Sequence, residues 1–259
     1  WEKQQLNKKH RPTLSLGGPL WVSWAGCSDA PAGMIQKVDV LITCLPSPSI
    51  SASMMEGEQG ALKGFSTGKI WLEMSTTDEA EVRRLGARVM HLGGRAADCP
   101  VSGGCHRAET GNIAILAGCE RATFEQILPL LSIMGREILH TGPLGSASTL
   151  KVCTNYLATA NLVSVCEALT VCKAAGLDLA TAYQAIRISS GNSFVRETEG
   201  QVILNGSRNI NFTMDLVLKD LGLFQKIADR SGVGLDLSPL LLEVFRDGQA
   251  RFGSREWSP

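Results

Sequence analysis

Two polar side chains at the start of a long apolar segment are the strongest candidates for chemistry in this sequence. Lys151 and Asn155 are four residues apart, so on a helix they share one face. The lysine follows a glycine-rich turn and precedes an apolar run, which predicts that its ammonium group is partly withdrawn from water. Withdrawal from water lowers the pKa of a lysine and prepares it for proton transfer near neutral pH. On spacing alone, a lysine that extends to the domain surface is an equally good interpretation.

Small and turn-forming residues follow three predicted strands, in the segments Leu45–Pro46–Ser47, Ser75–Thr76 and Ser102–Gly103–Gly104. In an open parallel sheet, ligands bind at the carboxyl ends of the strands, where these segments would meet. Gly103 and Gly104 can adopt backbone angles that other residues avoid, so their amide hydrogens could point at a carboxylate. Each segment alone is more simply explained as a strand-to-helix turn. Their convergence on one sheet edge favours a ligand site.

The elements that must position these residues alternate along the first half of the chain. Short apolar runs predict strands, and amphipathic stretches between them predict helices. The predicted strands are 38–45, 69–74, 95–101, 112–118 and 137–140, and the predicted helices are 49–62, 77–90 and 122–134. Thr76 and Glu79 match a capping box for the helix over 77–90. This alternation is typical of βαβ units, and it predicts an α/β domain with a mostly parallel, Rossmann-type sheet over residues 38–144.

The second half of the chain, residues 145–259, is predicted to be all helical. One long helix covers 146–175 and is ended by Gly176, a common helix-terminating residue. Further helices are predicted near 178–189, 192–204, 213–231 and 239–251. The chain therefore reads as a partial Rossmann-type sheet and a helical domain joined by the long helix.

Residues 1–37 do not fit the alternation and are predicted to be an irregular or truncated segment. A complete dinucleotide-binding domain needs three more strands before Val38, the first of which runs into a glycine-rich phosphate turn. The motif G-x-G-x-x-G does not occur in the chain. Gly17–Gly18 lacks the third glycine and the helix-forming run that should follow it.

Composition excludes several classes of function. The 259 residues include 25 basic and 25 acidic side chains, so no net field favours nucleic acid or an anionic membrane. Eight cysteines without a C-x-x-C pair indicate free thiols in a reducing compartment, and four isolated histidines predict no metal site. The apolar stretch from Tyr156 to Leu177 is interrupted by Asn161, Glu167 and Lys173, which favours a buried helix over a membrane span.

Three motifs, in matching order, resemble those of the β-hydroxyacid dehydrogenases, a family that includes 3-hydroxyisobutyrate dehydrogenase. The resemblance runs from about residue 38 to residue 253. The motifs are DCPVSGG at 98–104, with Cys99 where the family usually has Ala, G-x-x-G-x-x-x-x-x-K-x-x-x-N at Gly142, Gly145, Lys151 and Asn155, and LKDL at 218–221.

The resemblance implies an NAD- or NADP-dependent oxidoreductase that interconverts a small 3-hydroxy acid and its semialdehyde. By position it makes Lys151 the general acid/base. It assigns substrate binding to Ser102, Gly103, Gly104 and Asn155, and cofactor contacts to Leu45, Pro46, Thr76 and Lys219. Spacing alone would instead place Lys219 on a solvated helix face with Asp215 and Lys226, and Asp220 is interpreted as structural.

The missing glycine-rich turn leaves alternatives open. Without the helix N-terminus that cradles a pyrophosphate, we expect this chain to bind nicotinamide cofactors weakly or not at all. A non-catalytic dehydrogenase-like scaffold or a truncated inactive form is one alternative, and a glyoxylate- or tartronate-semialdehyde-type reductase is another. The resemblance further implies a homo-oligomer, dimer or tetramer, in the cytoplasm or, in a eukaryote, the mitochondrial matrix.

Overall fold

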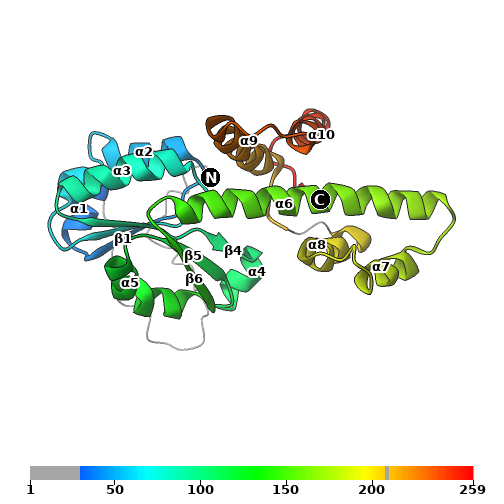
Figure 1. The fold of residues 1–259 in the computed structure, drawn as a ribbon, viewed down its shortest axis with the longest axis horizontal. Coiled ribbons are helices and arrows are strands. Elements are labelled where there is room, and N and C mark those ends of the chain that lie inside the picture. Colours follow the sequence, from blue (N-terminus) through cyan, green and yellow to red (C-terminus); the bar gives the residue numbers. More distant parts are fainter. Residues whose placement is uncertain (1–29, 208–209, 259) are drawn as a thin grey trace, which may run out of the picture.

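The computed structural model describes residues 30–207 and 210–258. It consists of a sheet covered by helices and a helical part, and the long helix α6 (Ser146–Ala174) connects the two (Figure 1). The predicted fold class, a mostly parallel α/β sheet followed by helices, is confirmed. The interpretation of Gly17–Gly18 falls outside the described residues.

The six-stranded sheet has two groups of parallel strands, and the two groups pair antiparallel with each other. Strands β1 (Val40–Thr43), β2 (Ile70–Glu73) and β3 (Arg95–Asp98) pair in parallel, in that order. β5 (Ala114–Gly118) pairs antiparallel with β3 through Asp98 and Gly118, and β6 (Glu137–Gly142) pairs in parallel with β5. The carboxyl ends of β1, β2 and β3 therefore form one edge, as expected for a ligand site.

The strand predicted over 95–101 is divided into two. β3 ends at Asp98, and the short β4 (Val101–Ser102) continues beside β5. Pro100 separates them, because it has no N–H group for the sheet and contributes only its carbonyl, which accepts from Leu116 N at 3.0 Å. After this break the chain rejoins the sheet in β4, where Ser102 pairs with Ala114 of β5.

Helices cover both faces of the sheet (Figure 1). The helices α1 (Pro31–Gln36), α2 (Pro48–Glu56) and α3 (Glu79–His91) lie on one side, and α5 (Arg121–Met134) lies on the other. Alternation along β2 supplies both cores: Trp71 packs in the cluster under α3, whereas Ile70 and Leu72 pack in the cluster under α5. A short 3-10 helix (Ala61–Gly64) and α4 (Gly104–Glu109) complete this part.

Helix α1 corrects the prediction that residues 1–37 are irregular throughout. It begins at Pro31, and proline is well suited to the first turn of a helix because its fixed backbone angle is already helical. Ile35 on α1 is fully buried in the same core cluster as Trp71.

The helical part is built around α6. The helices α7 (Leu179–Arg187) and α8 (Phe194–Leu204) lie on one side of it, and α9 (Met214–Ser231) and α10 (Leu237–Phe252) lie on the other (Figure 1). A core that includes Leu162, Leu221 and Phe245 joins α6 to α9 and α10. All the helices predicted after residue 145 are present, within a few residues of their predicted ends.

Candidate active site

Lys151 lies on the second turn of α6 and is almost completely buried, with 7% of its surface exposed. Its Nζ donates a hydrogen bond to Asn155 Oδ1 at 2.8 Å. The four-residue spacing on one helix therefore brings the two side chains into contact, as the sequence predicts. The alternative, a lysine that extends to the surface, is wrong for this residue, because the packing of α9 against α6 covers the ammonium group.

Asp220 completes this arrangement from α9. Asn155 Nδ2 donates to Asp220 Oδ2 at 2.6 Å, and Lys219 Nζ lies 3.1 Å from Asp220 Oδ1. Only 2% of Asp220 is exposed. The result is a linked set of four side chains, Lys151, Asn155, Asp220 and Lys219, which we call the lysine–carboxylate network.

The sequence interpretation missed Asp220, which it left as structural. A signal was available, because Asp220 falls on the buried stripe of α9 that includes Val217 and Leu221. A carboxylate on a buried stripe needs polar partners, because burial of an unpaired charge is costly. One of these partners, Asn155, is 65 residues away and could not be identified from spacing.

The environment of Lys151 lowers its pKa from 10.5 to about 8. Burial is the largest cause, because removal from water disfavours the charged ammonium. The carboxylate of Asp220 raises the pKa and the ammonium of Lys219 lowers it further. Lys151 can therefore exist as amine or ammonium near physiological pH, which is the property that a general acid/base needs.

Lys219 connects this network to the sheet edge. Its Nζ donates to the backbone carbonyl of Thr76 at 2.8 Å, and 19% of its side chain is exposed. The alternative that Lys219 lies on a solvated helix face is therefore wrong, because α9 packs this residue over the turn that follows β2. The cation and the turn face each other at the carboxyl end of a parallel strand, where a dinucleotide binds in this type of sheet.

Hydrogen bonds connect the turns that follow β1 and β2 at this edge of the sheet. Glu73, which is fully buried, accepts a hydrogen bond from Ser75 N at 2.9 Å, and Ser75 Oγ accepts one from Leu45 N at 2.7 Å. Burial raises the pKa of the Glu73 carboxyl group. Leu45 is partly buried and Pro46 is exposed, so both lie at the rim of the edge. Sequence reasoning gave Glu73 no part in the site.

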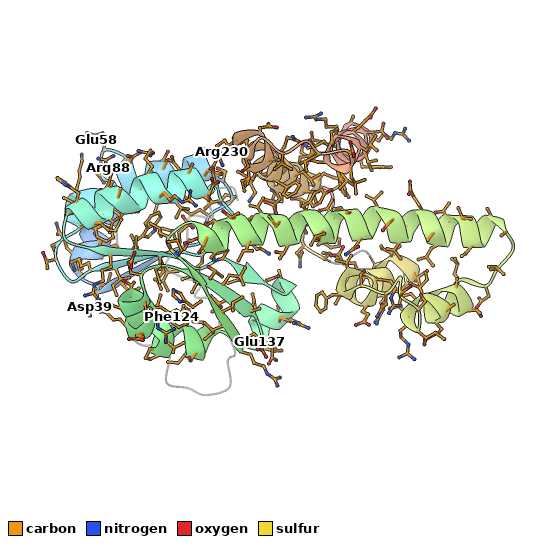
Figure 2. All side chains as sticks on the ribbon, in the orientation of Figure 1. Asp39, Glu58, Arg88, Phe124, Glu137 and Arg230 are labelled. Atoms are coloured by element: carbon orange, nitrogen blue, oxygen red, sulfur yellow. The ribbon has the colours of Figure 1, made fainter. Side chains whose placement is uncertain are left out.

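The capping box predicted for the next helix is wrong. Helix α3 begins at Glu79, and its N-cap is Asp78, whose Oδ1 accepts from Ala80 N at 3.0 Å. Thr76 is instead held by Lys219. The carboxylates of Asp78 and Glu79 pair with Arg230 at the end of α9, at 3.3 Å and 2.5 Å. Figure 2 shows Arg230 where α9 approaches the start of α3.

Asp98, the first residue of the DCPVSGG motif, anchors the start of α6. Its carboxylate accepts from Gly145 N at 2.7 Å and from Ser148 N at 2.6 Å, and the side chain is fully buried. These are unpaired amides of a helix N-terminus, which attract a negative charge. Burial raises the pKa of Asp98, and the two amides oppose that change. By holding α6 to β3, Asp98 sets the position of Lys151.

Two glycines make this anchor feasible. Gly145 has a φ of 90°, in the left-handed region that favours glycine, and it directs its N–H group toward Asp98. A Cβ atom on Gly118 would lie 2.4 Å from Asp98 Oδ1, so this position must also remain bare. Gly118 and Gly145 thus allow Asp98 to fix the start of α6, the helix that carries Lys151.

Ser102 ends β4, Gly103 is the N-cap of α4, and Gly104 is the first residue of α4, which Figure 1 shows beside β4. Gly103 and Gly104 have φ values of 130° and 76°, which confirms that this turn uses backbone angles reserved for glycine. In the described part of the chain, no hydrogen bond joins these residues to Lys151 or Asn155. Their role with a substrate remains a prediction.

Two family models match the chain in succession. Residues 8–142 match the NAD binding domain of 6-phosphogluconate dehydrogenase, and residues 145–256 match the model described as NAD-binding of NADP-dependent 3-hydroxyisobutyrate dehydrogenase. The nicotinamide cofactor expected from the motifs is thereby confirmed. The ammonium group of Lys219, which is partly buried, and the turns after β1 and β2 fit such a group at the sheet edge.

Characterised relatives agree with the family models. The chain is similar to 2-(hydroxymethyl)glutarate dehydrogenase of Eubacterium barkeri, with 32% identity over 219 residues that cover 84% of this chain and 73% of the relative. It is also similar to mitochondrial 3-hydroxyisobutyrate dehydrogenase of Rattus norvegicus, with 30% identity over 226 residues that cover 85% of this chain and 68% of the relative.

The same fold is found in the crystal structure of 3-hydroxyisobutyrate dehydrogenase from Salmonella typhimurium. The TM-score is 0.78 at 23% identity, and the match covers 88% of this chain and 79% of that one. The matches in sequence and the shared fold lead to one conclusion: this chain belongs to the 3-hydroxyisobutyrate dehydrogenase-like β-hydroxyacid dehydrogenases, and it is an NAD(P)-dependent oxidoreductase.

Proposed function

We propose that this protein interconverts a small 3-hydroxy acid and its semialdehyde, with Lys151 as the general acid/base. The observation that supports this most strongly is the burial of Lys151 beside Asn155, with the pKa of its amine lowered to about 8. In its neutral form Lys151 accepts the proton of the substrate hydroxyl group during oxidation. In the reverse direction its ammonium form returns that proton to the carbonyl oxygen.

The bound nicotinamide supplies the hydride acceptor or donor for the carbinol carbon. The other residues of the network keep Lys151 ready for its task. Asn155 holds the amine through Oδ1, and it is itself oriented by the carboxylate of Asp220. Lys219 bridges Asp220 and the turn at Thr76, so it links the acid/base to the edge that would receive the cofactor.

Substrate and cofactor take the remaining predicted positions. The backbone amides of Ser102, Gly103 and Gly104 bind the substrate carboxylate, in a turn that the two glycine φ values support. Asn155, which contacts Lys151, would also contact the bound substrate. Lys219 would contact the cofactor together with Leu45, Pro46 and Thr76, which lie on the turns after β1 and β2.

A steady-state assay tests this function. The purified chain is supplied with 3-hydroxyisobutyrate and a high concentration of NAD or NADP, and hydride transfer is followed by absorbance. We expect Lys151→Ala to lower kcat by about 100-fold or more, because general acid/base catalysis contributes at least that factor. The matched control is Lys173→Ala, which alters an exposed lysine on the same helix and should leave turnover unchanged.

The outcomes separate the alternatives. Equal turnover of Lys151→Ala and the unaltered chain would refute the role of Lys151. Absence of turnover with either cofactor, with correct folding shown by circular dichroism, would favour a non-catalytic scaffold. With NADH or NADPH supplied as the hydride donor, a faster reduction of tartronate semialdehyde or glyoxylate than of the four-carbon semialdehyde formed from 3-hydroxyisobutyrate would assign the chain to that class of reductase.

The homo-oligomer is proposed to form through the helical part. The most apolar 18 residues of α6 are hydrophobic enough, by composition, to cross a membrane. Only 22% of this stretch is buried within one chain. A groove of about 700 Å³ runs along α6 and α10, and its lining includes Val171, Val244 and Phe252, which are 67%, 49% and 64% exposed. A second copy would cover this apolar surface. Multi-angle light scattering that gives a monomer would refute the proposal.

The described cysteines are free, which supports a reducing compartment, either the cytoplasm or the mitochondrial matrix.

A further inference from the structure

Lys151 has the surroundings of a nucleophile as well as those of an acid/base. In the described part of the chain it has one hydrogen-bond acceptor, Asn155 Oδ1, and it forms no ion pair. The carboxylate that acts on the charge of Lys151 is that of Asp220. This carboxylate accepts a hydrogen bond from Asn155 and pairs with Lys219. As a neutral amine, Lys151 can donate one hydrogen bond to Asn155 and still direct its lone pair at a carbonyl carbon.

The second cation strengthens this tendency. Lys219 shares Asp220 with Asn155, so its positive charge opposes protonation of Lys151. Burial together with an adjacent cation is a known way in which proteins prepare a lysine to form imines with carbonyl compounds. The charged groups that act on Lys151 are Asp220 and Lys219, and both lie on α9.

We propose that Lys151 forms a reversible imine with small carboxylated aldehydes, the product class of the dehydrogenase reaction, when no hydride donor is bound. This inference rests on the proposed function only in that it takes the substrate class from it. When the oxygen of a bound aldehyde contacts Lys151 Nζ, the carbonyl carbon is one bond away from that oxygen. The carbon is then close to the amine that would add to it. The imine would retain a reactive aldehyde on the protein until the cofactor is replaced.

The step is balanced without an added oxidant or reductant. The Lys151 lone pair forms a carbon–nitrogen bond as the carbonyl π bond breaks, and the carbonyl oxygen takes up a proton. The resulting carbinolamine loses its hydroxyl group as water, and the nitrogen gives up its remaining proton to solvent. Lys219, as an ammonium group next to the network, can protonate the departing hydroxyl group. Hydrolysis reverses the sequence.

Reductive trapping tests the inference in the absence of nicotinamide cofactor. The folded chain is incubated at about pH 8 with glyoxylate or succinic semialdehyde and cyanoborohydride, and peptide mass spectrometry measures the modified fraction of each lysine. With a pKa of about 8, half of Lys151 is a neutral amine, against about 0.3% for a lysine whose pKa is 10.5. Restricted access reduces that advantage, so we expect Lys151 to react about 10-fold or more faster than Lys173.

Two comparisons make the result specific. Propionaldehyde lacks the carboxylate that the turn at Gly103 and Gly104 would hold, so it should show a smaller preference for Lys151 than glyoxylate does; an equal preference would show that the carboxylate is not recognised. Lys151→Arg should abolish the fast-reacting fraction, whereas Lys173→Arg should leave it unchanged. If Lys151→Arg does not fold, the lysine-by-lysine map of the unaltered chain still decides the question.

The results distinguish this inference from the proposed function. Labelling that merely follows the exposure of the surface lysines overturns the inference, and it leaves the dehydrogenase proposal intact if Lys151→Ala still loses turnover. Selective labelling of Lys151 in a chain that has no dehydrogenase turnover supports the inference and refutes the proposed function.

Discussion

Replacing Lys151 by methionine should change the pH dependence of stability in a way that reports the buried amine directly. Methionine is unbranched and apolar, so it can occupy much of the same space without a charge. In the folded chain the pKa of Lys151 is about 8, against 10.5 for an ordinary lysine in the unfolded chain. Between these two values the unfolded chain holds a proton on this residue that the folded chain does not hold.

The sign and size follow from that difference. Because the unfolded state binds more protons in this window, the stability of the unaltered chain rises as the pH rises from about 8 to about 10.5. Below about pH 8 the folded chain bears the whole penalty of a buried ammonium. From about pH 7 to about pH 9.5, we expect the Lys151 term to add about 2 kcal/mol to the free energy of unfolding. Methionine has no such term.

Urea denaturation followed by circular dichroism measures the effect. The stability of Lys151→Met minus that of the unaltered chain should decrease by about 2 kcal/mol between about pH 7 and about pH 9.5. The loss of the hydrogen bond to Asn155 shifts this difference by the same amount at both pH values, so it cancels. Lys173→Met, on the exposed side of the same helix, should give a flat difference. A flat difference for Lys151→Met as well would refute the lowered pKa.

Three further substitutions test the rest of the site. Asp220→Asn removes the negative charge that raises the pKa of Lys151, so the pH midpoint of reductive trapping at Lys151 should move below about 8; an unchanged or higher midpoint would contradict the network. Asp98→Ala leaves two buried amides at the start of α6 without an acceptor and should lower the free energy of unfolding in urea by about 2–4 kcal/mol. Gly145→Ala places a side chain on a left-handed backbone, with its Cβ 2.6 Å from Arg83 Nε. The free energy of unfolding should fall by about 1–2 kcal/mol in the same assay. An unchanged free energy of unfolding would show that the turn relaxes freely.

Most of the elements could be predicted because their signals are local. Apolar runs such as VDVLITCL and KIWLEM have the length and composition of strands, and each contains one, although Ile42 of β1 is exposed. The long helix over 146–175 was predicted within one residue of its observed end. Errors arose where several local signals competed, as at Asp78, which caps α3 in place of the predicted pair Thr76 and Glu79.

Contacts between distant residues could not be predicted. The switch to antiparallel pairing depends on the single pair Asp98 and Gly118, and no pattern within either strand indicates its direction. The anchor from Asp98 to Gly145 spans 47 residues, and the contact from Lys219 to Thr76 spans 143. Each depends on how α6 and α9 pack on the sheet, so neither spacing nor composition contains it.

The sequence by itself determined which chemistry was available: a lysine and an asparagine one helical turn apart, glycines at the turns, and a sheet whose edge can hold a ligand. Only the tertiary structure decided how basic that lysine is. Its pKa depends on the loss of water around Nζ and on the charges of Asp220 and Lys219, which α9 brings to α6. Electrostatic energy depends on distance and on the surrounding medium, and both are set only when the chain is folded.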